Sequence, residues 1–184
     1  MGGEEMKRWN QISGFFFPEE AKELQELAKD KVCLEMGSFH GKSTIALAEV
    51  AKTVYAVDTF RASGNGAEQV KGAAHEFTNL LPFCTNIFGY TNIRICIGLS
   101  HEIAKTFDDN SFDLIFVDGS HKYEDVLLDK KSWWPKLKDQ GVMAFHDYKG
   151  FPGVTKAVDE VFNSDQITGP VVSLCWVTKD HEKI

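Results

Sequence analysis

Two glycines close to an acidic residue are the first candidates for chemistry. Residues 35–43 read EMGSFHGKS, and only three residues separate Gly37 from Gly41. A P-loop needs four residues there, because its successive backbone N–H groups surround the phosphates. The dinucleotide pattern G-x-G-x-x-G fails as well, since Phe39 replaces its second glycine. The carboxylate of Glu35 repels a polyphosphate, so the loop favours a ligand with a positive charge.

Asp58 is the second candidate, 21 residues after Gly37 and at the end of the apolar run VYAVD. A carboxylate in this place accepts hydrogen bonds from both hydroxyls of a ribose. Together, the loop and Asp58 predict a nucleoside that carries positive charge rather than phosphates. The alternatives without a ligand are a tight strand–helix turn at the glycines and a strand-end cap at Asp58.

Further polar residues follow two later apolar runs. Asp118 follows LIFV, His121 comes three residues later, and His146 and Asp147 follow VMAF. Carboxylates and imidazoles grouped at strand ends indicate acid–base chemistry or metal binding. The alternatives are an inert surface histidine and carboxylates that serve only the fold or bind substrate directly.

Alternating elements must position these residues. Continuous apolar runs predict strands at 32–36, 54–57, 93–97, 112–117 and 142–145, then two short strands near residue 167 and at 171–177, around a turn at 169–170. Apolar periodicity predicts helices from residue 18, at 43–51, about 68–81, from near 100, about 123–137 and at 154–162. This alternation is typical of an α/β fold with a parallel sheet covered on both faces, whose ligands lie beyond the C-terminal ends of the strands.

From about residue 30 onward, the chain resembles class I S-adenosylmethionine-dependent methyltransferases. Its LEMGSFHGKS (34–43) is similar to their first motif and VYAVD (54–58) to their second. FDLIFVDGSHKYE (112–124) and GVMAFHDY (141–148) resemble a small-molecule subgroup that includes sugar O-methyltransferases of macrolide biosynthesis. The resemblance implies a Rossmann-like, doubly wound sheet of seven strands in the order 3-2-1-4-5-7-6, with the last strand antiparallel and helices on both faces.

The resemblance also implies functional residues. Those expected to bind S-adenosyl-L-methionine are Glu35, Gly37, Ser38, Gly41, Ser43, Asp58, Thr59, Gly98 and Asp118. In the D-x-x-H pattern of the sugar enzymes the aspartate is a metal ligand and the histidine is the base, which implies these roles for Asp118 and catalytic His121. The resemblance also implies that Asp147 is a further metal ligand. His146 stands where those enzymes have another acid, so the metal set Asp118, His146 and Asp147 suits Mg²⁺ less well and favours a transition metal or no metal.

Composition limits the remaining function classes. A chain of 184 residues predicts a single domain over 1–184, in which residues 1–17 are a candidate lid. The net charge of −7 argues against nucleic acid as a partner. The apolar runs are too short for a membrane span, the four cysteines are widely spaced, and the first residues do not form a signal peptide. We therefore expect a cytoplasmic protein, and a homo-oligomer is compatible with the sequence.

The sequence predicts a methyltransferase that acts on a hydroxyl of a small molecule. One alternative is a module that binds the cofactor without turning it over. Another is a degenerate P-loop NTPase, because GKS is followed later by a strand that resembles Walker B; we instead interpret Lys42 as a solvated lysine. Residues 61–90 and the first 17 residues are expected to shape the acceptor site, although neither segment carries a readable code for the acceptor.

Overall fold

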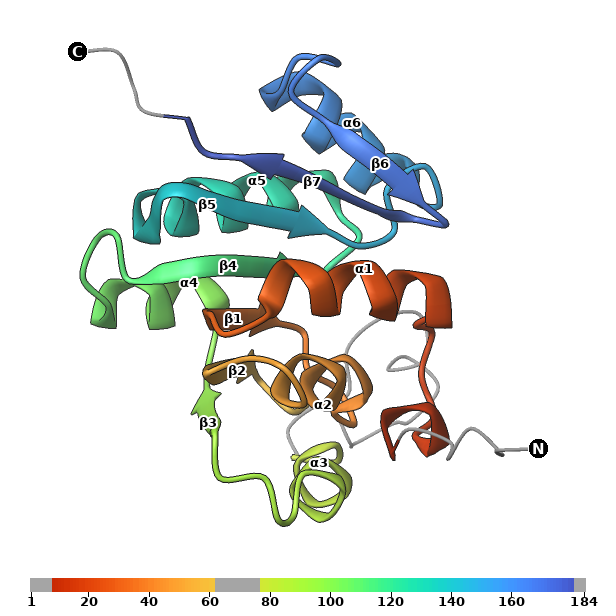
Figure 1. Ribbon diagram of the computed structural model, residues 1–184. Helices are drawn as coiled ribbons and strands as arrows, with labels where there is room; N and C mark the ends of the chain where they lie inside the picture. Colours follow the sequence, from red (N-terminus) through yellow and green to blue (C-terminus); the bar gives the residue numbers. More distant parts are fainter. Residues whose placement is uncertain (1–7, 62–76, 181–184) are drawn as a thin grey trace.

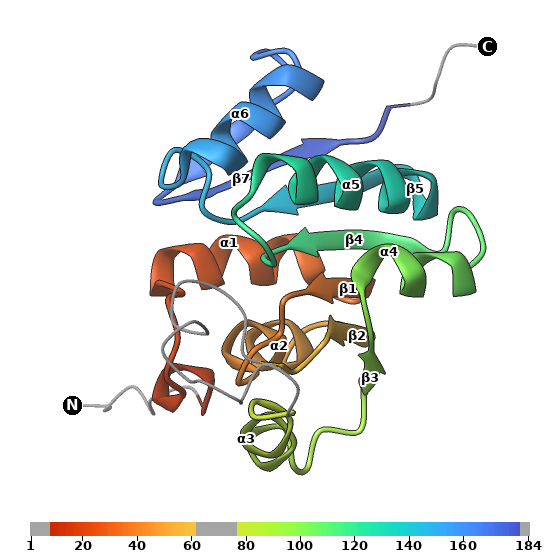
Figure 2. The same ribbon diagram turned by 180° about the vertical axis from the view of Figure 1, so that it is seen from behind.

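A seven-stranded sheet forms the centre of the protein, with helices on both faces (Figures 1 and 2). The computed structural model describes residues 8–61 and 77–180. The strands are β1 (Val32–Met36), β2 (Thr53–Asp58), β3 (Ile93–Ile97), β4 (Phe112–Val117), β5 (Leu137–Phe145), β6 (Thr168–Val171) and β7 (Leu174–Thr178). Their order is β3-β2-β1-β4-β5-β7-β6, and β7 is antiparallel to both of its neighbours. The predicted strand order and the antiparallel last strand are confirmed.

The helices bury the two faces of this sheet in separate apolar clusters. The α-helices are α1 (Pro18–Ala28), α2 (Lys42–Ala48), α3 (Leu80–Asn86), α4 (Ser100–Ile103), α5 (Tyr123–Trp133) and α6 (Pro152–Val161), and the 3-10 turns are η1 (Arg8–Gln11), η4 (Ala104–Thr106) and η5 (Trp134–Lys136). In β4, Phe116 packs in the cluster of α1 and α2, whereas its neighbour Val117 packs in the cluster of α5 and α6. Alternate residues of a strand point to opposite faces, so a strand covered on both sides must be apolar throughout.

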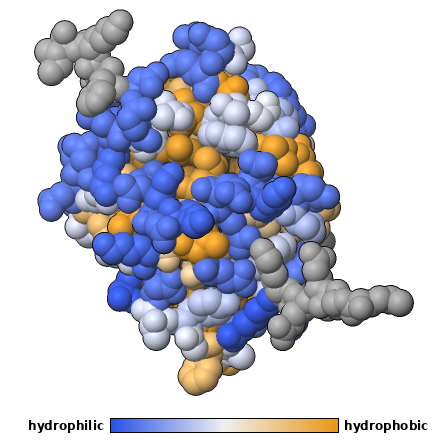
Figure 3. Space-filling view, in the orientation of Figure 1, coloured by the Kyte–Doolittle hydropathy of each residue, from blue (hydrophilic) through white to orange (hydrophobic). Residues whose placement is uncertain are grey.

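The surface reflects this division between core and exterior. On the face drawn in Figure 3, hydrophilic residues predominate, and hydrophobic residues form smaller areas between them. None of the helices within the described ranges has both the length and the apolar character that a membrane crossing requires.

Several predicted elements differ from the structure. Most of the predicted helix 68–81 and the turn at 63–66 lie outside the described residues, and the described chain becomes helical at Leu80, in α3, which we did not predict. Pro82 is tolerated there because the first backbone N–H groups of a helix have no partner within it.

Helix α5 ends at Trp133 rather than near residue 137, since Pro135 cannot continue the ladder of backbone hydrogen bonds. The reversal expected at 169–170 lies instead between β6 and β7, at residues 172–173.

The register of the parallel strands brings their polar ends together. Met36 pairs with Val117, and Val117 pairs with Phe145. The residues that follow β1, β4 and β5 therefore emerge at one edge of the sheet. Asp58 ends β2 at the same edge, next to Ile97 of β3.

Candidate cofactor and catalytic site

The loop after β1 approaches the end of β4 so closely that only glycine fits. Gly37 has a φ of +87°, and a Cβ atom built there would lie 2.0 Å from the backbone oxygen of Asp118. Gly41 is also left-handed, with a φ of +88°, and is the N-cap residue of α2. The two glycines thus turn the chain from β1 into α2 against the end of β4.

A hollow of about 300 Å³, partly open to solvent, lies beside this loop. Its lining residues are Ser13, Gly14, Phe15, Phe16, Gly37, Ser38, Phe39, His40, Lys42, Ser43 and Asp118. Lys42 is half-buried, and its Nζ donates a hydrogen bond of 3.0 Å to the exposed backbone oxygen of Gly14. This contact joins the predicted lid segment to the first turn of α2.

Unpartnered polar atoms beneath the hollow indicate what it can bind. Glu35 is fully buried; its Oε2 accepts a hydrogen bond from the Thr44 hydroxyl, while its Oε1 has no hydrogen-bond partner among the described residues. Ser38 Oγ is equally buried and unpartnered within those ranges. Burial raises the pKa of Glu35 to about 7, although the hydroxyls of Ser43, Thr44 and Ser38 act in the opposite direction. A buried acceptor of this kind suits a cationic donor such as an ammonium group.

Asp58 fixes the glycine loop from the end of β2. Its Oδ2 accepts the Phe39 N–H at 2.8 Å, and its Oδ1 accepts the Phe60 N–H at 2.6 Å. Gly98, after β3, donates its N–H to the Asp58 backbone oxygen at 3.0 Å, so the turn after β3 adjoins Asp58. Thr59 Oγ1 accepts the Arg61 N–H at 3.4 Å. The predicted cofactor residues on β1, β2 and β3 are therefore neighbours at one sheet edge.

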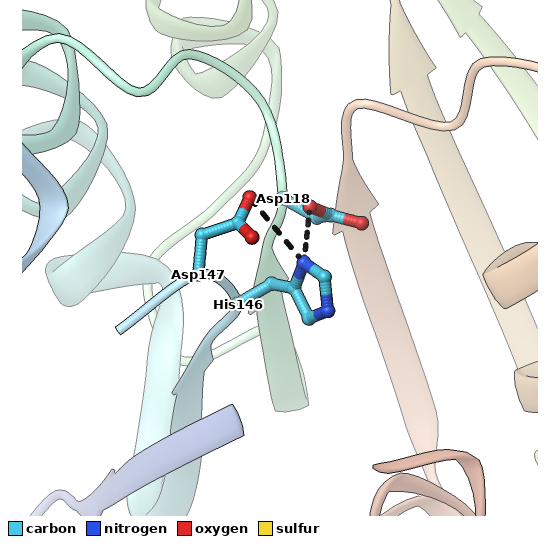
Figure 4. A group of neighbouring side chains, drawn as sticks. All are labelled: Asp118, His146 and Asp147. Carbon is cyan, nitrogen blue, oxygen red and sulfur yellow. Dashed lines mark ion pairs between the residues drawn. The ribbon is translucent and has the colours of Figure 1, made fainter. Parts of the chain in front are cut away.

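A second group of predicted residues meets where β4 and β5 end (Figure 4). His146 Nδ1 lies 3.1 Å from Asp118 Oδ1 and 3.5 Å from Asp147 Oδ2. One donor atom from each of these three residues lies within 4.8 Å of the others, as metal ligands require. His121 joins the group, since its Nε2 is 2.7 Å from Asp147 Oδ2. The structure thus brings together all four residues that the sequence assigned to catalysis or metal binding.

The charges in this group depend strongly on one another. Burial alone would lower the pKa of His146, but the carboxylates of Asp118, Asp147 and Glu20 raise it to about 12. Burial likewise favours a neutral Asp147, yet both histidines hold the pKa of its carboxyl well below the usual range. The hydrogen bond to Asp147 raises the pKa of His121. Burial raises the pKa of Asp118, a shift that His146 partly offsets.

Two residues that the sequence did not indicate hold the two imidazoles. Glu20 of α1 is fully buried, and its Oε2 lies 3.1 Å from His146 Nε2. Phe151 stacks on the His121 ring with a centroid distance of 3.9 Å and an interplanar angle of 21°. Glu20 stands three residues after Phe17, the N-cap of α1. A glutamate is common at this position because it accepts the N–H of the N-cap residue, so helix capping alone accounts for it. No local pattern connects it with a residue 126 positions away.

Comparison with known proteins identifies the family. A methyltransferase domain family matches residues 34–148, and the chain belongs to this family. The sheet of this protein is the Rossmann-like sheet of S-adenosylmethionine-dependent methyltransferases. The O-methyltransferase NovP has a similar fold, and the two structures superpose with a TM-score of 0.72 at 16% identity, over 88% of this chain and 80% of NovP. The calicheamicin methyltransferase CalS11 gives a TM-score of 0.59 at 16% identity, over the same 88% and 80%. Family membership favours the methyltransferase prediction over the P-loop NTPase alternative.

A curated relative in sequence is the uncharacterized protein y4gI of Sinorhizobium fredii. The two are 28% identical over an alignment 127 residues long, which covers 62% of this chain and 13% of the relative. The chain therefore spans a small part of the length of that protein.

Proposed function

We propose that this protein transfers a methyl group from S-adenosylmethionine to a hydroxyl of a small molecule. The observation that carries the proposal is the position of Asp118, which lines both the hollow beside the glycine loop and a second hollow bordered by His121, His146 and Asp147. A donor held in the first hollow would be adjacent to an acceptor hydroxyl placed at the second. Such alignment of donor and nucleophile is the main contribution that a protein makes to this transfer.

The residues around the first hollow suit the cofactor. When bound, S-adenosylmethionine supplies an electrophilic sulfonium methyl group. We assign the ribose hydroxyls to Asp58 and the amino-acid end to Ser38, Ser43 and the glycine loop, with Glu35 acting from beneath. Gly98 and Thr59 then border the nucleoside. The unpartnered Glu35 and Ser38 oxygens support this orientation, because a bound ammonium group would satisfy them.

His121 is the proposed base for the acceptor hydroxyl. Its Nε2 hydrogen bonds with Asp147, which leaves Nδ1 as the ring atom that can accept a proton. The side chain is 45% exposed, so an acceptor can reach it. Asp147 stabilises the imidazolium that forms, and the stacked Phe151 ring restricts its orientation.

We also propose that Asp118, His146 and Asp147 hold a divalent ion. Their donor atoms are carboxylate oxygens and one imidazole nitrogen, a set that binds divalent metals. When bound, such an ion lowers the pKa of a coordinated hydroxyl and orients it. Asp147 Oδ2 lies close to both His121 Nε2 and His146 Nδ1, so proton removal and metal binding would share this carboxylate.

A small acceptor is also part of the proposal. The net charge of −7 supports it, because a nucleic acid requires a basic surface. Half of the proposed acceptor region, residues 61–90, lies outside the described ranges. Residues 13–16 of the candidate lid line the first hollow.

The test separates binding from turnover. Calorimetry should show binding of S-adenosylmethionine and S-adenosylhomocysteine but not of ATP, and mass spectrometry of extracts incubated with the enzyme should reveal a methylated hydroxyl compound. With that acceptor, His121→Ala should lower kcat by about 10²–10⁴-fold with unchanged cofactor affinity. Cofactor binding without a product would favour the non-catalytic module, a fully active His121→Ala would remove the base, and full activity in EDTA would remove the metal.

A further inference from the structure

Glu20 is a buried carboxylate with a complete set of partners. It is 0% exposed, and its Oε1 accepts both the backbone N–H of Ser173 at 2.9 Å and the Ser173 hydroxyl at 2.7 Å. Its Oε2 accepts the Phe17 N–H at 3.0 Å and lies 3.1 Å from His146 Nε2. Donors from α1, from the turn between β6 and β7 and from the end of β5 thus fix this carboxylate in one place.

This arrangement determines which nitrogen of His146 faces the site. Each ring nitrogen lies 3.1 Å from a carboxylate oxygen, Nε2 from Glu20 and Nδ1 from Asp118. An ion bound at Nδ1 would replace the proton there and leave Nε2 as the nitrogen that donates to Glu20. Nδ1 then faces Asp118 and Asp147, as Figure 4 shows. The side chain is 4% exposed, and Nδ1 makes no well-aligned hydrogen bond within residues 8–61 and 77–180. The rings of Phe16 and Phe116, at centroid distances of 5.8 and 6.2 Å, pack against the imidazole and restrict its rotation.

The distances around Nδ1 fit ligands that share one ion. Two ligands at right angles, each bound at about 2.1 Å, are about 3.0 Å apart. The separations of 3.1 and 3.5 Å from Nδ1 to the two carboxylate oxygens are close to this value. Histidines that bind metals commonly donate their other N–H to a carboxylate, which sets the tautomer and the ring orientation. Glu20 stands in that relation to His146.

We propose that Glu20 is a positioning residue that presents His146 Nδ1 as a metal ligand, and that the site therefore takes a transition-metal ion in preference to Mg²⁺. Imidazole nitrogen binds Mn²⁺, Co²⁺, Zn²⁺ and Cu²⁺, whereas Mg²⁺ prefers oxygen ligands. This inference rests on the metal site of the proposed function. It does not depend on the cofactor or on the acceptor, so it can be tested without either.

The first experiment identifies the ligand. The purified protein is loaded with less than one equivalent of Cu²⁺ and examined by pulsed electron paramagnetic resonance, which detects the remote nitrogen of a coordinated imidazole. We expect this signal in the wild type and not in His146→Asp. A wild-type spectrum without it, or an unchanged signal in His146→Asp, would overturn the proposal.

The second experiment measures selectivity and the role of Glu20. Calorimetric titrations should give tighter binding of Mn²⁺ than of Mg²⁺. In His146→Asp, the affinity for Mn²⁺ relative to the affinity for Mg²⁺ should fall at least about tenfold. Glu20→Gln should weaken Mn²⁺ binding about 10–100-fold. The matched control is Glu19→Gln, an exposed neighbour on the same helix, which should bind Mn²⁺ like the wild type.

A further variant keeps the proposal testable if Glu20→Gln does not fold. Ser173→Ala removes one hydrogen bond to Glu20 and leaves its carboxylate in place, so we expect a smaller but measurable loss of Mn²⁺ affinity. Unchanged affinity in folded Glu20→Gln, or in Ser173→Ala where Glu20→Gln does not fold, would refute the positioning role. A wild type that binds no ion would overturn the metal inference, while cofactor binding and methyl transfer would be judged by their own assays.

Discussion

Replacing Asp58 by asparagine tests the proposed ribose site with little change in side-chain shape. In the structure, each carboxylate oxygen already accepts one backbone N–H, from Phe60 and from Phe39. A carboxylate has about four acceptor positions, so about two remain for the two hydroxyls of a ribose. Asparagine has one acceptor oxygen. Whichever way its amide is turned, its NH₂ group faces the backbone N–H of either Phe39 or Phe60.

The expected loss follows from this count. At least one hydrogen bond between a hydroxyl and a charged oxygen disappears, and such bonds contribute about 1.5–3 kcal/mol. Affinity for S-adenosylmethionine should therefore fall about ten- to a hundredfold, at about 1.4 kcal/mol per factor of ten. One backbone N–H, of Phe39 or Phe60, also loses its acceptor, so the free energy of unfolding should fall by about 1–3 kcal/mol.

Calorimetry with S-adenosylhomocysteine and its 2′-deoxy analogue distinguishes loss of the ribose contact from loosening of the loop. The wild type should bind the analogue more weakly than the parent compound, whereas Asp58→Asn should discriminate less between them. Asp165→Asn, an exposed position outside the site, is the control. A folded Asp58→Asn that binds the cofactor as tightly as the wild type, or discriminates as strongly, would refute the assignment.

Two further predictions concern the glycine loop and the acid beneath it. Gly37→Ala should lower the free energy of unfolding by about 2–5 kcal/mol in urea titrations, because a left-handed alanine costs about 1–2 kcal/mol and overpacking about 1–3 kcal/mol more. The added Cβ would lie 2.0 Å from the backbone oxygen of Asp118. In the control Gly150→Ala, the added Cβ lies no closer than 3.4 Å to its neighbours. Equal stability of the two variants would contradict this reasoning. Glu35, with a pKa of about 7, ionises as the pH rises through that value, so affinity for the cationic cofactor should rise over the same interval. Glu35→Gln should remove this rise, and a wild-type affinity that does not change with pH between about 6 and 8 would argue against the carboxylate's role.

Local sequence predicted the positions of the parallel strands and several residues that lie together where those strands end. The predicted strands 32–36, 93–97 and 112–117 have the bounds of β1, β3 and β4. β1 and β4 are buried, largely apolar runs bounded by polar residues or glycine, and in such strands the run itself sets the length. β3 is a mostly exposed edge strand that ends at Gly98. Because parallel strands end at one edge, the residues after them were also expected to be neighbours, as Asp118, His146 and Asp147 are.

Local sequence was less informative where proline and chain reversal set the ends of elements. Helix α3 contains Pro82 in its first turn, where proline is tolerated, so the usual sign of a helix boundary was misleading. In α5 the apolar periodicity continues to Leu137, but Pro135 ends the hydrogen-bonded ladder and Leu137 belongs to β5. Periodicity describes which face a residue would occupy, not whether the backbone can continue in the same form.

Only the tertiary structure determined the contacts that give the site its chemistry. Glu20 and His146 meet because α1 packs over the sheet, and Lys42 reaches Gly14 because the chain before α1 crosses the glycine loop. In sequence, Glu20 fits the first turn of a helix that begins at residue 18 and Lys42 fits a solvated position, so neither residue indicates a distant partner. A buried charge requires a partner, but which distant charge serves depends on the packing of elements that share no sequence pattern. The sequence therefore determined which residues gather at the sheet edge, and packing determined how His146 is oriented among them.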